Sequence, residues 1–129
     1  MSWEGKKTKA DFNRYSSLKT RYLDHYHFQK DSPLTEQSAS TKVCLVYDSI
    51  RAGIEALTAL HGYRVYTHVG LVEFIKHSLK NDALASRFDT YRIIRNRIQY
   101  DGKNISVQKA AKLIEDMEDF LYHLGHLLQ

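Results

Sequence analysis

The chain has 129 residues with a formal net charge of +4, and 43% of its residues are hydrophobic. This length suits one domain with a single core, and the composition argues against disorder along the whole chain. The single cysteine, Cys44, excludes an internal disulfide. No apolar run approaches the roughly 18 residues of a membrane span, and Met1–Lys7 does not resemble a secretory leader, so we expect a cytoplasmic protein.

Glycine and proline are scarce and apolar residues recur at helical spacing, which predicts long helices. After a flexible N-terminus of residues 1–8, we expect a first helix over about residues 8–28. Residues 30–41 contain the only proline and predict a loop, with Ser40 or Thr41 capping the next helix. That second helix is expected over about residues 42–61, ended by Gly62. Its expected buried residues are Val43, Val46, Tyr47, Ile50, Ile54, Leu57 and His61.

A shorter third helix is expected near residues 66–79, burying Val69, Val72, Phe74 and Ile75. Asn81-Asp82 should begin a fourth helix that runs to about Tyr100, followed by a turn of Asp-Gly type at residues 101–104. Ser106 should cap the last helix. We therefore expect one all-α domain over residues 1–129: an up-and-down antiparallel bundle of four main helices plus one short helix.

Arg95 is the residue that most needs an explanation. On a helical projection, Leu84, Phe88, Tyr91, Ile94 and Ile98 form the apolar face of the fourth helix. With Tyr91 as zero and about 100° per residue, Arg95 lies at about 40°, inside that face. A guanidinium placed there is costly unless something pairs with it.

Three kinds of partner for Arg95 are open: an acid of the same chain, a second subunit, or a phosphate. Asp48 and Glu55 lie on one side of the second helix, at the margin of its apolar stripe, and either is placed to meet Arg95. However, the end of this helix carries more hydrogen-bond donors than one carboxylate can satisfy. They are side chains that contact phosphates and bases: Arg92, Arg95, Asn96, Gln99 and Tyr100.

Other chemistries find no support in the sequence. The pairs His25/His27 and His123/His126 lack carboxylates at metal-binding spacing, so we expect no metal site. No phosphate-binding glycine loop, nucleophile elbow or dinucleotide fingerprint occurs, so we expect no cofactor. Cys44 has apolar neighbours and is expected to be a small core residue.

The segment Arg95–Tyr100 resembles the signature of HEPN domains (higher eukaryotes and prokaryotes nucleotide-binding), which are small helical bundles. That signature is an arginine, often followed by a polar residue such as Asn, with a histidine four to six residues on. The resemblance covers nearly the whole chain from about residue 10. It includes a small-residue second helix, a histidine-containing turn and the last helix: Tyr47, Ala52 and Ala56; Gly62 and His68–Leu71; and Val107–Leu124.

The resemblance implies a homodimer whose signature helices face each other. It also implies metal-independent ribonuclease chemistry, with an arginine orienting phosphate and a histidine transferring protons. Here Tyr100 stands where active members have histidine, and Gln99 stands where a branch with tyrosine usually has an acid. A phenol, with a pKa near 10, is a poor general base at neutral pH, so little or no nuclease activity is expected.

We therefore expect a HEPN-like dimeric module that binds RNA or a nucleotide, with Arg92, Arg95, Asn96, Gln99 and Tyr100 as binding residues. The resemblance further implies a separate minimal nucleotidyltransferase as partner in a toxin–antitoxin pair. A second hypothesis is a metal-independent endoribonuclease toxin that uses Arg95 with Tyr100 or His68. A third is an interaction scaffold in which Arg95 pairs with Asp48 or Glu55.

Overall fold

Residues 6–128 are described by a computed structural model, which is all-α apart from one short strand pairing. Along these residues the elements are β1 (Lys6–Lys7), α1 (Phe12–Lys30), α2 (Ala39–Leu60), β2 (Tyr63–Arg64), α3 (His68–His77), α4 (Asp82–Asp101) and α5 (Val107–Leu127). The four long helices and the short α3 match the expected set of helices. No helix of this part of the chain is both long and apolar enough to cross a membrane.

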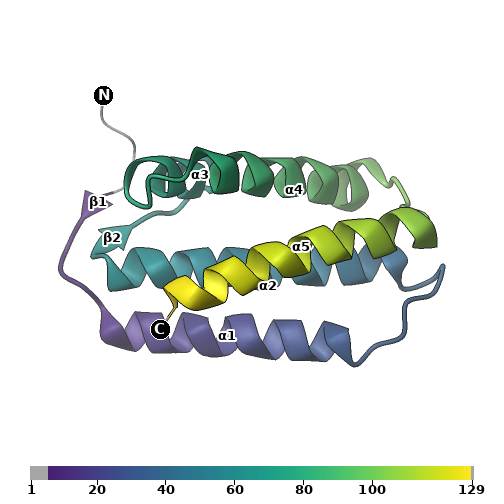
Figure 1. The fold of residues 1–129 in the computed structure, drawn as a ribbon, viewed down its shortest axis with the longest axis horizontal. Coiled ribbons are helices and arrows are strands. Elements are labelled where there is room, and N and C mark those ends of the chain that lie inside the picture. The colour runs from purple at the N-terminus through teal and green to yellow at the C-terminus, as the bar shows by residue number, and fades with distance from the viewer. Residues whose placement is uncertain (1–5, 129) are drawn as a thin grey trace.

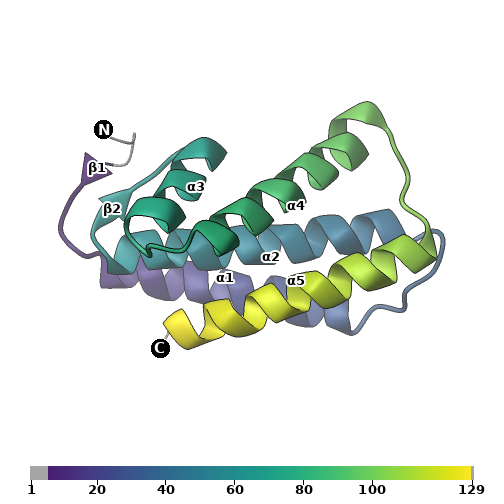
Figure 2. The same cartoon turned by 45° about the horizontal axis from the view of Figure 1, so that its top comes forward.

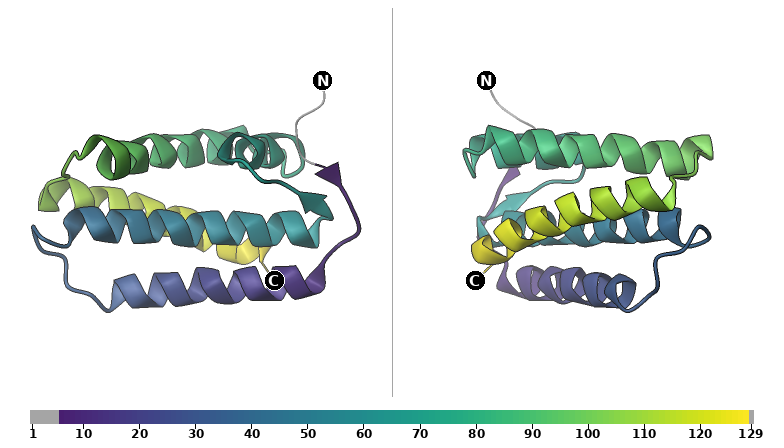
Figure 3. Two further views of the ribbon diagram at one scale, coloured as in Figure 1. Left: turned by 180° about the vertical axis from the view of Figure 1, so that it is seen from behind. Right: turned by 45° about the vertical axis from the view of Figure 1, so that its right-hand side comes forward.

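Helix α2 lies at the centre of the helical bundle. It packs against α1, α4 and α5, and Figures 1 and 3 show it between the layer of α1 and the layer of α3 and α4. Its central residues are small on one side, at Ala52, Gly53 and Ala56, and all three are buried. Small side chains let neighbouring helices approach closely, since a Cβ at Gly53 would lie 2.5 Å from Leu124 Cδ2.

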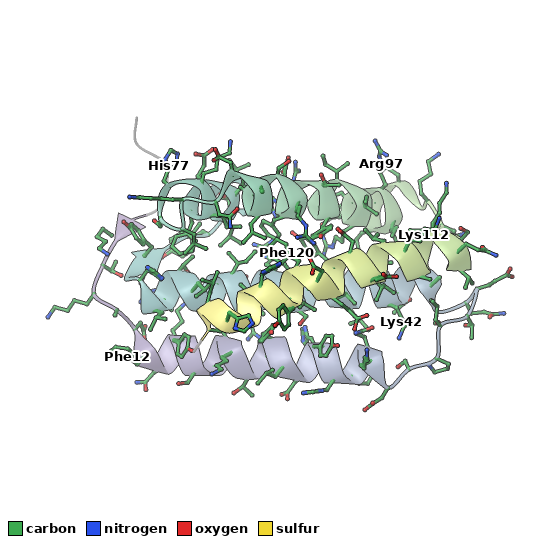
Figure 4. All side chains as sticks on the ribbon, viewed as in Figure 1. Phe12, Lys42, His77, Arg97, Lys112 and Phe120 are labelled. Carbon is green, nitrogen blue, oxygen red and sulfur yellow. The ribbon has the colours of Figure 1, made fainter. Side chains whose placement is uncertain are left out.

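Helix α5 joins the two layers. On one side Tyr26 of α1 donates a hydrogen bond to Glu118 at 2.8 Å. On the other, Tyr91 of α4 donates to the Asp116 carboxylate at 2.5 Å, and its ring meets Phe120 edge to face. Phe120 lies in the middle of the molecule in Figure 4.

Helix α4 crosses α2 at an angle, and its C-terminal end lies apart from the other helices in Figure 2. The burial of its residues agrees: Phe88 and Tyr91 are buried, Ile94 and Ile98 are partly buried, and Tyr100 is 72% exposed. The end of α4 that carries the candidate residues is therefore accessible on one side and packed on the other.

Most helix ends follow from local capping chemistry. Asn81 and Ser106 accept hydrogen bonds from the backbone N–H groups of Leu84 and Lys109, as expected of caps. Gly62 has φ of 78°, and a Cβ there would lie 2.5 Å from the Thr8 carbonyl oxygen, so the turn requires glycine.

The expected start of α2 is wrong. The helix begins at Ala39, and neither Ser40 nor Thr41 caps it. The Ser40 hydroxyl instead accepts a hydrogen bond from the Ile105 N–H at 3.2 Å. This contact joins segments far apart in the chain, so the local sequence does not predict it. Two residues expected in the core are also exposed: His61, just after α2, and Val69, which is 59% exposed near the start of α3.

The flexible N-terminus expected at residues 1–8 is only partly testable, because residues 1–5 lie outside the described chain. Lys6–Lys7 form strand β1, which pairs antiparallel with β2. The Lys7 ammonium donates to the His61 carbonyl at 2.6 Å and lies 4.4 Å from the centre of the Tyr63 ring. Strand pairing and a cation–π contact therefore hold part of the segment that the sequence predicted to be flexible.

We predict that Gly53→Ala lowers the free energy of unfolding by about 1 kcal/mol or more. The new methyl group would press on the buried Leu124 and lie 3.2 Å from Tyr22 Cδ1, and overpacking of this kind costs about 1–3 kcal/mol. Gly125→Ala is the matched control, because a Cβ there would lie 3.7 Å from Tyr22 Oη, an ordinary van der Waals distance. Urea denaturation measures both; equal stability of the two variants would contradict the close packing of α2 on α5.

Candidate functional site

Arg95 of α4 points toward α2 and lies between two tyrosine rings. Its guanidinium carbon is 5.5 Å from the centre of the Tyr47 ring on α2 and 5.7 Å from that of Tyr100. Nη1 is 3.5 Å from both the Asn96 Oδ1 and the Tyr100 hydroxyl oxygen, the outer limit for hydrogen bonds. The Nε–H group is buried and has no acceptor among the described residues. Arg95 is thus packed against aromatic surface while most of its five donors lack a strong acceptor.

The carboxylates considered as partners do not form an ion pair with Arg95. Glu55 instead pairs with Arg51, at 3.1 Å, and with Arg14 of α1, at 3.7 Å. Asp48 is near enough to feel the charge of Arg95, but burial is the larger effect and raises the pKa of its carboxyl above the ordinary value. No Asp48 oxygen lies within 4 Å of the Arg95 guanidinium in the described structure.

We call this surface the α2–α4 seam. It consists of Cys44, Tyr47, Asp48 and Arg51 on α2 and Arg92, Arg95, Asn96, Gln99 and Tyr100 on α4.

The arginines of the seam differ in how they are neutralised. Arg92 pairs with Asp89 of its own helix at 3.1 Å, and Arg51 pairs with Glu55 at 3.1 Å. Within residues 6–128, Arg95 is the seam arginine without a carboxylate partner. A positive charge that is half-buried and unpaired attracts an anion from outside the chain.

His68, at the start of α3, reaches the seam through Tyr47. The Tyr47 hydroxyl lies 2.6 Å from His68 Nδ1, and the imidazole stacks on Phe88 at 4.3 Å. Burial, together with the positive charges of Arg92 and Arg51, lowers the pKa of His68 to about 4. The imidazole is therefore neutral at physiological pH. With Tyr47 as the donor to Nδ1, the remaining proton is on Nε2, which has no hydrogen-bond partner in the described chain.

The structure brings together most of the residues expected at the site. Arg95 contacts both Asn96 and Tyr100, and Gln99 is exposed at the same end of α4. Glu55 is engaged elsewhere, and Arg92 is occupied by Asp89. Among the described residues, no group of three or more His, Cys, Asp or Glu is arranged to hold a metal ion.

The sequence interpretation missed the part that Tyr47 plays in the site. It placed Tyr47 in the core, which is correct, since the residue is 2% exposed. A buried tyrosine hydroxyl normally has a hydrogen-bond partner, and this general rule was the available signal that a polar group must lie nearby. The rule could not identify His68 as that partner.

The arrangement combines three recognition elements within about two turns of α4. The Arg95 guanidinium offers unsatisfied N–H donors to an anion, the exposed Tyr100 ring offers a stacking surface, and the Asn96 and Gln99 amides offer donors and acceptors. Together these suit a phosphate joined to a flat heterocycle.

No known protein-family model matches the chain, and no curated protein sequence matches it. Functional assignment therefore depends on the residues of the seam, and the resemblance to HEPN domains stays a prediction.

We predict that His68 makes the protein less stable as the pH falls. The folded pKa of about 4 lies below the ordinary 6.5, so between these values the unfolded chain binds a proton that the folded chain does not. The free energy of unfolding should fall by as much as about 3 kcal/mol between pH 6.5 and pH 4 through this residue. Urea denaturation across this range should show a shallower pH dependence for His68→Gln than for the wild type; identical slopes would contradict a neutral, buried imidazole.

Proposed function

We propose that the protein is a HEPN-like homodimeric module that binds single-stranded RNA or a nucleotide at the α2–α4 seam, with little or no nuclease activity. The observation that carries this proposal is the unpaired state of Arg95, whose Nε–H is buried without an acceptor. Phosphate oxygens would accept hydrogen bonds from the guanidinium N–H groups. Their negative charge would also pair with Arg95, which neither Asp48 nor Glu55 does in the described structure.

Single-stranded RNA fits the seam better than other polyanions do. Tyr100 is 72% exposed beside Arg95, so an unpaired base can stack on its ring next to a bound phosphate. Stacking of this kind is worth about 1–3 kcal/mol per base. A duplex hides the base faces and would leave this ring unused.

The homodimer and the partner protein are further parts of the proposal. Ile93 of α4 exposes 40% of its surface, and an exposed apolar side chain on this helix suits contact with a second subunit. A separate minimal nucleotidyltransferase, in a toxin–antitoxin pair, is proposed from the resemblance to HEPN domains. A gene for such an enzyme next to the gene for this protein would support that pairing.

We predict that Arg95→Met weakens binding of a fluorescent single-stranded RNA by about tenfold or more, measured by anisotropy at low salt. Arg97→Met is the matched control. Arg97 is exposed, two residues away on the same helix, and points out from the bundle in Figure 4. Both variants remove one positive charge, so general electrostatic attraction to RNA falls equally in the two.

Equal affinities of these two variants would overturn the proposal, because the net charge would then explain all binding. A large loss of stability in Arg95→Met, without a change in RNA affinity, would favour the interaction scaffold instead. We expect little loss of stability, since the described structure gives Arg95 no ion pair within the chain.

A metal-independent endoribonuclease is the second candidate, favoured by the position of His68. Its imidazole is neutral and contacts Tyr47, the residue on which Arg95 packs. The imidazole would take the place of the histidine that active HEPN members have only if Tyr47 released its hydrogen bond to Nδ1, because Nε2 already carries the ring proton and lies 3.8 Å from the Asp89 carboxylate. The low pKa of His68, about 4, argues that such a base is weak at neutral pH.

We predict that purified protein leaves single-stranded RNA intact during incubation with EDTA, as judged by gel electrophoresis. Cleavage in EDTA that disappears in Arg95→Met would instead establish the ribonuclease. Loss of that cleavage in His68→Gln would assign the proton transfer to the imidazole, and loss in Tyr100→Phe would assign it to the phenol.

A further inference from the structure

A small hollow lies beside Arg95, between the first turn of α2 and the end of α4. Its volume is about 280 Å³, and it is lined by Ser40, Thr41, Cys44, Ile98 and Gln99. We call it the end hollow.

The end hollow continues the same strip of surface that holds Arg95. On α4, Ile98 and Gln99 follow Arg95 by three and four residues, so all three lie on one face. On α2, Cys44 precedes Tyr47 by three residues and lies near enough to Arg95 to feel its charge. Along the axis of α4, the residues that line the hollow therefore follow Arg95 by about one helical turn, or 5.4 Å.

The lining of the end hollow differs from the surroundings of Arg95. Ile98 is half-buried and aliphatic, and Cys44 is a half-buried thiol that is neutral because burial raises its pKa. Thr41 and Gln99 are exposed and place a hydroxyl and an amide at the rim. Among residues 6–128, no charged side chain lines the hollow, so it suits a neutral, flat group with donors and acceptors on its edge more than it suits a phosphate.

We propose that the end hollow receives an unpaired nucleobase of the RNA strand whose phosphate contacts Arg95, and that Gln99 contacts the edge of that base. The inference rests on the proposed function and adds to it: the site takes a nucleotide with its base, rather than a bare phosphate. The ribose that joins a base to its phosphate spans the one-turn separation between the two positions. Tyr100 stays free to stack a neighbouring base.

The test compares two labelled probes by anisotropy: a uridylate hexamer and a ribose-phosphate hexamer of the same length without bases. The wild type should bind the uridylate hexamer about tenfold more tightly than the abasic one. A difference of this size corresponds to the contribution of one or two bound bases. Thr41→Trp fills the hollow from its exposed rim and should remove this preference. Gln99→Ala should reduce the preference about threefold or more. Thr41→Trp should leave the affinity for the abasic hexamer unchanged, because Thr41 lies at the rim of the hollow and is not one of the seam residues.

Thr20→Trp is the control for the added indole, because Thr20 is an exposed residue of α1, in the layer opposite α4 in Figure 1. Equal affinity of the wild type for both hexamers would overturn the base site. If Arg95→Met then weakened the binding of both hexamers, the proposed phosphate contact at Arg95 would still hold. Loss of both hexamers in Thr41→Trp would also overturn it, since the backbone would then occupy the hollow. Failure of both hexamers to bind the wild type would overturn the base site and the proposed function together.

Discussion

The packing of Tyr47 against α4 and the start of α3 holds the candidate site together. Its ring lies parallel to Phe88 at 5.8 Å, its hydroxyl contacts His68, and the Arg95 guanidinium lies 5.5 Å from its centre. One buried side chain thus touches all three elements and fixes where Arg95 and His68 stand relative to each other. A shift of α2 against α4 would therefore change the position of Tyr47 relative to Arg95.

The helices and several of their ends could be predicted from the sequence because the determinants are local. Asn81 and Ser106 cap the helices that follow them, and Gly62 has the positive φ expected of a residue after a helix end. The strand pairing of Lys6–Lys7 could not be predicted, because the paired residues lie 56 and 58 positions apart along the chain. The exposure of Val69 could not be predicted either, since hydrophobicity alone does not say which side of a short helix packs against the core.

The part of the site on α4 could be predicted, because its residues lie within two turns of one helix, where long side chains can reach one another: Arg95 Nη1 lies 3.5 Å from the Tyr100 hydroxyl oxygen. The partner on α2 could not. Asp48 and Glu55 share a side of that helix, yet they lie about 10 Å apart along its axis, and spacing does not tell which turn faces Arg95. The structure sets Tyr47 there instead. An aromatic face attracts the guanidinium without occupying the N–H groups at its edge, and this leaves those donors for an anion.

In the proposed function, the Arg95 guanidinium, which has no ion pair among residues 6–128, binds a phosphate of RNA in the α2–α4 seam. The Nε–H resonance of Arg95, assigned by its absence in Arg95→Lys, reports on this most directly in a ¹H–¹⁵N NMR titration with single-stranded RNA. We expect that resonance to shift in proportion to bound RNA and to exchange more slowly with water, while that of Arg97 changes little. An Arg95 resonance that stays unchanged while RNA binding shifts other residues would contradict the claim.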